Sequence, residues 1–143
     1  MTFIYLTTFR ENQKKSPRCV SVAHVLLSWR PGKFVLNCHE STTPTANAAL
    51  STLIQALKEL PFKQDHIKII SDNHELVWDM QRVLTGEAGE FISKRLWSEF
   101  INTLAENDMS MGQIRVSENG IMLSSEKDMA RQQITQTNWG ISL

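Results

Sequence analysis

The order of strand-like and helix-like segments is the feature that most constrains how this chain can fold. Residues 2–9 are β-branched and aromatic, and residues 19–29 and 34–40 repeat this strand-like character around a turn at 30–33 that contains a Pro-Gly pair. The first segment is apolar on both faces, which is typical of an interior strand. The simplest arrangement is an antiparallel pair, joined by the turn, beside the strand formed by residues 2–9.

The next segment has the period of a helix. Leu50, Leu53 and Leu57 recur three or four residues apart, and Pro61 ends the pattern. Hydroxyl residues and a proline at 41–45 precede it, as is typical of a helix start. This is the most strongly patterned helix in the sequence.

Four shorter segments and a polar C-terminal stretch complete the order. We predict a strand at 66–70, a helix at 75–84, a helix at 93–106, a strand at 113–117 and a closing helix at 125–136. A strand reached through a helix is expected to run parallel to its neighbour, whereas tight connections give antiparallel pairs. The sequence therefore predicts a mixed sheet covered by helices, in a layered α/β (α+β) domain.

Length and composition indicate one globular domain spanning residues 1–143. Hydrophobic residues make up 41% of the chain and charged residues 21%, which is enough apolar material for a core. Lys plus Arg and Asp plus Glu each number 15, so any binding to nucleic acid must come from a local patch. No apolar run approaches bilayer or signal-peptide length, and we expect a soluble, cytoplasmic protein. Cys19 and Cys38 are interpreted as small buried residues.

Five local strings, in order, resemble the ribonuclease H family. Residues 52–58 (TLIQALK) resemble its first helix, and 69–73 (IISDN) resemble its fourth strand with the acidic residue that follows. Residues 94–97 (KRLW) are similar to the start of a later helix, 114–116 to its fifth strand, and 128–131 (DMAR) to its closing helix. The resemblance covers nearly the whole chain and implies a five-stranded mixed sheet, with three antiparallel strands plus parallel strands, flanked by helices.

Active members of this family use two divalent cations, and oxygen-rich carboxylates, about four in all, hold them. The family's Asp-Gly pair on the first strand corresponds to Thr7 and Thr8 in this chain, and its helix glutamate corresponds to Ala49. Asp72, after the fourth strand, matches the family aspartate. The resemblance therefore identifies Asp72 as the one clearly retained metal and catalytic position.

The remaining family positions fall near the C-terminus. The aspartate of the closing helix corresponds to Lys127, with Asp128 one residue along, and the loop histidine corresponds to Asn119. Asp72 and Asp128 are thus the residual catalytic candidates. Too few carboxylates remain to neutralise two cations, and we expect weak or absent metal-dependent cleavage. Three other acids would reach the same edge only if the alignment shifted: Glu11, Glu40 and Glu75.

Several candidate residues also have ordinary structural interpretations. Asp72 could be the N-cap of the helix that begins near Glu75, and Asp128 could be a solvated residue of a polar helix. Trp78 and Trp97 have aliphatic neighbours at helical spacing, and core packing is favoured for both. The same periodicity puts five apolar residues on one face of the helix at 93–106: Leu96, Trp97, Phe100, Ile101 and Leu104.

Two histidines and a basic segment are the other candidate sites. A two-residue turn at Pro31-Gly32 would set His24 opposite His39, where the pair could share a metal with further ligands missing. Four basic residues crowd into the connection after the first strand, where they could contact phosphates or simply be solvated. They are Arg10, Lys14, Lys15 and Arg18.

The amino-acid sequence is compatible with three functions. The favoured one is a catalytically degenerate ribonuclease H-like domain, without a cofactor, that binds nucleic acid such as an RNA–DNA hybrid or binds a protein partner. The second is an active nuclease that requires Mg²⁺ or Mn²⁺ and cleaves the RNA strand of RNA–DNA hybrids. The third is a protein-interaction or inhibitor module without a nucleic-acid role. Fold alone cannot choose among them, since function depends on the site.

Overall fold

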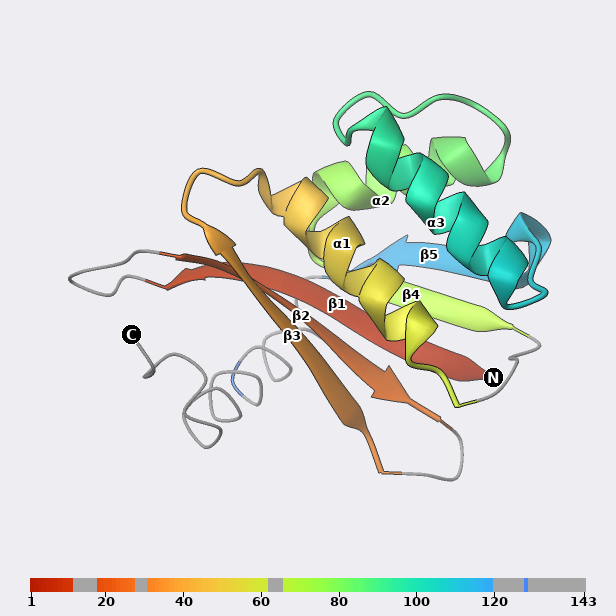
Figure 1. The fold of residues 1–143 in the computed structure, drawn as a ribbon, viewed down its shortest axis with the longest axis horizontal. Helices are drawn as coiled ribbons and strands as arrows, with labels where there is room; N and C mark the ends of the chain where they lie inside the picture. Colours follow the sequence, from red (N-terminus) through yellow and green to blue (C-terminus); the bar gives the residue numbers. More distant parts are fainter. Residues whose placement is uncertain (12–17, 28–30, 62–65, 120–127, 129–143) are drawn as a thin grey trace.

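A computed structural model describes residues 1–11, 18–27, 31–61, 66–119 and 128 (Figure 1). One twisted sheet forms the lower layer in this view, and the helices of the described part lie together on one of its faces. The closing helix predicted at 125–136 falls outside the described residues, apart from Asp128. The layered α/β prediction is confirmed.

The sheet has five strands in the order β3-β2-β1-β4-β5. β1 pairs antiparallel with β2, and β2 pairs antiparallel with β3. β1 pairs parallel with β4, which pairs parallel with β5. The apolar segment at the N-terminus therefore forms the central strand, as its two-sided hydrophobicity predicts. The bounds are β1 Thr2–Glu11, β2 Arg18–Leu26, β3 Lys33–Glu40, β4 Ile67–Ser71 and β5 Ile114–Glu118.

Three α-helices connect the later strands: α1 (Thr45–Lys58), α2 (His74–Leu84) and α3 (Lys94–Glu106). The Asn73 side chain caps α2 by accepting from the backbone N–H of Leu76 at 3.0 Å, and Ser93 caps α3 in the same way. A short 3₁₀ helix, η1 (Met111–Gln113), leads into β5.

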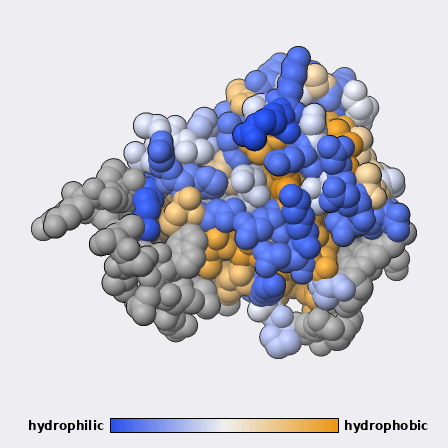
Figure 2. Space-filling model, in the orientation of Figure 1, coloured by the Kyte–Doolittle hydropathy of each residue, from blue (hydrophilic) through white to orange (hydrophobic). Residues whose placement is uncertain are grey.

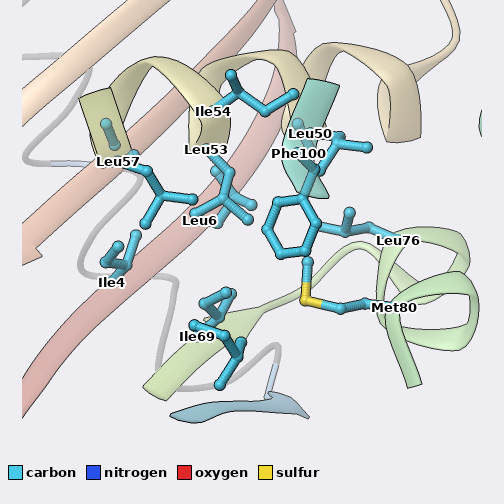
Figure 3. Close-up of a cluster of buried hydrophobic side chains, with 14 of the residues drawn as sticks. Ile4, Leu6, Leu50, Leu53, Ile54, Leu57, Ile69, Leu76, Met80 and Phe100 are labelled. Atoms are coloured by element: carbon cyan, nitrogen blue, oxygen red, sulfur yellow. The ribbon is translucent and has the colours of Figure 1, made fainter. Parts of the chain in front are cut away.

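The main core fills the space between α1, the sheet and the other two helices (Figure 3). Leu50, Leu53 and Leu57 point from α1 toward Ile4 and Leu6 of β1, so the helical leucine pattern is the buried face. Phe100 of α3 meets Leu76 and Met80 of α2 in the same cluster, which closes the core over β4. These packed residues are all fully buried: Ile4, Leu6, Leu50, Leu53, Leu57, Ile69, Leu76, Met80 and Phe100.

Some sequence predictions about burial are wrong. Trp97 is buried, as expected, but Trp78 is 44% exposed and Ile101 is 39% exposed. Ile101 lies at the margin of the buried face of α3, whereas Trp78 lies on the face of α2 opposite the buried residues. Cys19 is fully buried, whereas Cys38 is only half-buried beside a second, smaller apolar cluster around Val20 and Val22.

The β2–β3 hairpin has a different register from the one expected. The connection spans residues 27–32, so His24 pairs with Phe34 and Cys19 pairs with His39. Positions 19 and 24 differ by an odd number, which puts the two histidines on opposite faces of the sheet. The His24 ring instead stacks on Phe34, with ring centroids 4.3 Å apart. The predicted His24–His39 metal pair is therefore wrong.

Figure 2 shows hydrophilic residues interspersed with smaller hydrophobic patches across the face that carries the helices. This mixed surface is typical of a water-exposed layer over a buried core. Within the described residues, no helix combines the length and the apolar character needed to cross a membrane.

Candidate functional site

The candidate site lies where β1 and β4 reach the same edge of the sheet. The two strands are parallel, with Leu6 paired to Ser71, so Thr7 and Asp72 are the next residues along each strand. The Thr7 hydroxyl donates to the Asp72 carboxylate at 2.9 Å. The structure thus brings together the two positions that the family resemblance relates to metal ligands, and the first of them carries a hydroxyl.

Polar contacts around Asn73 hold this edge in shape. The Asn73 backbone N–H donates to the Ser71 hydroxyl at 3.0 Å, and its side-chain amide donates to the Thr45 hydroxyl at 3.0 Å. Because the Asn73 side chain also caps α2, one residue joins β4, α1 and α2. The alternative interpretation of Asp72 as the helix N-cap is wrong: the cap is Asn73, and Asp72 is left facing Thr7.

The donor set at this edge does not fit a pair of divalent cations. Hard cations prefer several charged oxygen ligands. Among the described residues, the adjoining ends of β1 and β4 offer one carboxylate, that of Asp72, and its partner Thr7 carries a neutral hydroxyl and is 1% exposed. Ala49, at the position of the family glutamate, is fully buried in the main core and has no oxygen to offer. Among the described residues, no group of three or more His, Cys, Asp and Glu side chains could hold a metal ion.

The acids that an alignment shift would bring to this edge do not complete a site. A further acid near this edge, which sequence reasoning did not consider, is Glu118: it ends β5 beside Ser71, and its Oε1 lies 2.8 Å from His74 Nδ1. Glu40 ends β3, which is separated from β4 and Asp72 by β2 and β1, and Glu11 ends β1. Glu75 lies in the exposed first turn of α2. In the described part of the chain, none of these acids belongs to a group of three or more side chains that could hold a metal ion.

The two C-terminal family positions are also described. Asp128 is exposed and belongs to no acidic cluster of three within the described part of the chain. Asn119 follows β5, and its backbone N–H donates to the Ser71 carbonyl at 3.0 Å. This bond ties the end of β5 to the end of β4 beside Asp72.

The basic connection begins at the same edge of the sheet. Arg10 is exposed near the end of β1, and its guanidinium donates to the backbone carbonyl of Ser41 after β3. Arg18 is half-buried at the start of β2, where its register partner on β3 is Glu40. Lys14 and Lys15 lie outside the described residues.

A buried carboxylate that sequence reasoning missed lies elsewhere, between α2 and α3. Asp79 is fully buried and accepts hydrogen bonds from the backbone N–H groups of Glu90, Phe91 and Ile92, at 2.8 to 3.2 Å. The Trp97 indole adds a longer bond of 3.3 Å. Burial alone would raise the pKa of Asp79, but these donors outweigh it and hold the pKa below its ordinary value of 3.8. The available signal was an acid on the apolar face of the helix, because Asp79 is three residues after Leu76 and four residues before Val83.

Asp79 acts as a structural anchor for the α2–α3 loop, because every donor that surrounds it belongs to that loop or to α3. Gly89 lies against it: a Cβ there would come within 2.6 Å of a carboxylate oxygen of Asp79. The carboxylate is enclosed by protein, so it has no room for a substrate. We therefore exclude Asp79 from the candidate site.

Two other titratable groups lie under α1, on β2 and β3. Burial raises the pKa of the Cys19 thiol, and the nearby Arg10 charge only partly opposes this. Burial lowers the pKa of His39, its cross-strand neighbour. A thiol with a raised pKa is a poor nucleophile at neutral pH, so the Cys19–His39 pair is not a catalytic dyad.

The comparisons with known proteins concern the fold. No protein-family model and no curated protein matches the sequence. Among solved structures, LC11-RNase H1 in complex with an RNA/DNA hybrid superimposes with a TM-score of 0.59 at 12% identity, over 83% of this chain and 85% of that chain. A structure of LC11-RNase H1 isolated from compost by a metagenomic approach superimposes with a TM-score of 0.58 at 14% identity, over 90% of this chain and 92% of that chain. RNase H1 from the halophilic archaeon Halobacterium salinarum superimposes with a TM-score of 0.50 at 14% identity, over 82% of this chain and 85% of that chain.

Proposed function

Because the chain has a ribonuclease H-like fold, we propose that it binds nucleic acid without metal-dependent cleavage. One observation carries the proposal: at the sheet edge formed by β1 and β4, a single carboxylate, Asp72, accepts a hydrogen bond from the neutral Thr7 hydroxyl. The scaffold is present, while the oxygen ligands that a two-cation reaction needs are absent from this pair of positions.

The electrostatics of the edge explain why cleavage is not expected. Two divalent cations a few ångströms apart repel each other strongly, and only several carboxylates between them offset that repulsion. One carboxylate, already accepting from Thr7, supplies one negative charge. A single weakly held cation would lack the second ion that stabilises the leaving oxygen.

Binding is supported by charge at the same edge and by a structural neighbour. Arg10 is exposed beyond Thr7 on β1, at the start of the segment that also contains Lys14 and Lys15. LC11-RNase H1, which shares the fold, has been solved in complex with an RNA/DNA hybrid. Because the net charge of this chain is zero, its affinity would come from this local group of cations, and salt would weaken it.

A binding titration tests the first half of the proposal. A fluorescent RNA–DNA hybrid is titrated with the chain at 50 and 200 mM salt, and we expect affinity to fall steeply with salt. The double variant Lys14→Glu and Lys15→Glu should bind more weakly at low salt and have a shallower salt slope. Its matched control is Lys33→Glu with Lys58→Glu, which makes the same charge change at the opposite end of the sheet. Absence of binding, or equal loss in both double variants, would contradict the proposal.

A cleavage assay tests the second half. The labelled hybrid is incubated with the chain in Mg²⁺ and in Mn²⁺, and we expect no cleavage above that of a mock preparation, with Asp72→Asn giving the same result. Cleavage that disappears in Asp72→Asn would overturn the proposal and establish the active nuclease instead.

A further inference from the structure

The β5 strand is an outer strand of the sheet. In the order β3-β2-β1-β4-β5, one side of β5 pairs with β4 and no described strand pairs with the other. An unpaired strand edge carries backbone donors and acceptors that can pair with another extended chain. The geometry of β5 determines which groups are available.

The backbone groups of Val116 and Glu118 point away from β4. The Asn119 N–H donates to the Ser71 carbonyl on β4, and residues alternate in direction along a strand. Ser117 and Arg115 therefore point their N–H and C=O groups toward β4, and the residues between them point outward. The Ile114 N–H is already used, since it donates to the Met111 carbonyl. The outward edge thus offers the N–H and C=O groups of Val116 and Glu118.

A groove runs beside this edge, between β5 and α2. It encloses about 340 Å³ and combines apolar and polar lining residues. Leu84, Met111 and Val116 form its apolar part, and each is half-buried against the main core. Gln81 and Thr85 line its α2 side. The groove therefore has the volume to accept an apolar side chain next to a strand edge that can bind main chain.

The exposed Trp78 lies on the same face of α2 as two residues that line this groove. Trp78, Gln81 and Thr85 are three and four residues apart, so they lie along one face of α2. Trp78 is 44% exposed, which is unusual for so large a side chain. At the end of that face, the contact between His74 and Glu118 joins α2 to β5. A strand added to β5 would pass this aromatic surface.

The charge of the groove indicates what kind of segment fits it. Arg115 lines the groove and is exposed, and it makes no ion pair within the part of the chain described here. A carboxylate on an incoming strand would be its natural partner. We propose that β5 accepts an extended segment of a partner protein, which pairs with Val116 and Glu118, inserts an apolar side chain between α2 and β5, and presents an acidic side chain to Arg115. This protein-binding role is independent of the proposed nucleic-acid binding.

Selection from a display library tests the proposal. Random 12-residue peptides are selected on the full chain, and the enriched sequences should alternate apolar and polar residues and contain Asp or Glu. A labelled peptide from the selection is then titrated by fluorescence anisotropy. Val116→Pro removes one outward N–H and should weaken binding at least tenfold, whereas Val116→Thr keeps that N–H, changes only the side chain and should weaken binding less.

Two exposed positions keep the test decisive if Val116→Pro does not fold. Arg115→Glu should weaken binding about tenfold, with Arg115→Lys closer to the wild type, and Trp78→Ala should weaken it several-fold. Hydrogen exchange of the Val116 and Glu118 amides should slow in the complex. A library without binders, or binders indifferent to all these changes, would overturn the proposal.

Two further results would assign the edge to another occupant and overturn the proposal as well. One is a concentration-dependent dimer that protects the Val116 amide without peptide, because a second copy would then cover β5. The other is an Arg115→Glu chain that loses hybrid affinity as strongly as it loses peptide affinity, because the edge would then belong to a nucleic-acid surface. We expect a monomer by sedimentation and unchanged hybrid affinity in Arg115→Glu.

Discussion

Replacing Thr7 by Asp tests directly whether the β1–β4 edge lacks the negative charge of a cation site. Thr7 is 1% exposed and its hydroxyl lies 2.9 Å from the Asp72 carboxylate, so a second carboxylate at position 7 would lie very close to the first. Without a cation the two charges repel. A cation bound between the two carboxylates attracts both of them and offsets their repulsion.

The size of the effect follows from the distance. Two like charges about 3 Å apart repel by about 1.4 kcal/mol in a water-like dielectric and by about 5.5 kcal/mol at an effective dielectric of about 20. The pair can also take up a proton, which limits the cost at pH 7 to about 4 kcal/mol if one pKa rises to near 7. We therefore expect Thr7→Asp to be about 1–4 kcal/mol less stable than Thr7→Asn, its neutral equivalent of similar shape. The difference should shrink toward pH 4, because protonation of one carboxyl removes the repulsion.

Thermal unfolding with and without Mn²⁺ measures this prediction. Each kcal/mol corresponds to roughly 3 °C in Tm for a chain of this size. An ion that binds only the folded state at ten times its Kd adds about 1.4 kcal/mol. Mn²⁺ should therefore raise the Tm of Thr7→Asp by several degrees and leave the wild type and Thr7→Asn unchanged. A wild type stabilised by Mn²⁺ as much as Thr7→Asp, or equal Tm values for the Asp and Asn variants, would refute the reasoning.

Three other predictions concern stability. Asp79→Asn should lower the free energy of unfolding in urea by about 3–5 kcal/mol, because an amide cannot accept from all the backbone N–H groups that Asp79 satisfies; a loss below 1 kcal/mol would contradict the anchor role. Since the folded pKa of Asp79 lies below 3.8, its contribution is present above that pH and is lost as pH falls further, so acid titration curves should be flatter in the variant. Gly89→Ala should lower the free energy of unfolding by about 1–3 kcal/mol. Gly112→Ala is the control and should leave the free energy of unfolding nearly unchanged, because its added Cβ would meet its nearest atom at 3.8 Å. Equal losses in the two variants would count against the close approach at Gly89. Because burial lowers the pKa of His39, the free energy of unfolding should fall as pH drops below 6.5. In thermal melts, His39→Gln should lose less stability than the wild type over this pH range. The same dependence of Tm on pH in both proteins would argue against a neutral His39 ring in the folded state.

Local patterns were sufficient to predict the elements of the described part. The helix at Leu50, Leu53 and Leu57 was visible because residues on one helix face recur every three or four positions, and α1 buries that face. The strand at residues 2–9 was visible because it is apolar on both sides, which matches the central place of β1. Trp78 was not predictable in this way: it is a large apolar residue, yet it lies on the face of α2 opposite the buried residues and is exposed.

The chemistry at the candidate site was partly predictable. The residue types were available from the beginning: Thr7 and Ala49 have no carboxylate wherever they lie, and Asp72 has one. The contacts between these residues could not be predicted from the sequence. Whether Asp72 caps a helix or faces another strand depends on the register of β1 with β4, and Asn73, one residue later, proved to be the cap.

The amino-acid sequence by itself determined which segments are strands and helices and which charged side chains are available for a site. Both depend on residue type and on spacing over a few positions. Tertiary structure alone decided the β2–β3 register, the hydrogen bond from Thr7 to Asp72, the enclosure of Asp79 by loop N–H groups, and the outer edge of β5, with which no described strand pairs. Each of these brings together residues distant in sequence, whose separation in space depends on how whole elements pack. Local preferences carry no information about that packing.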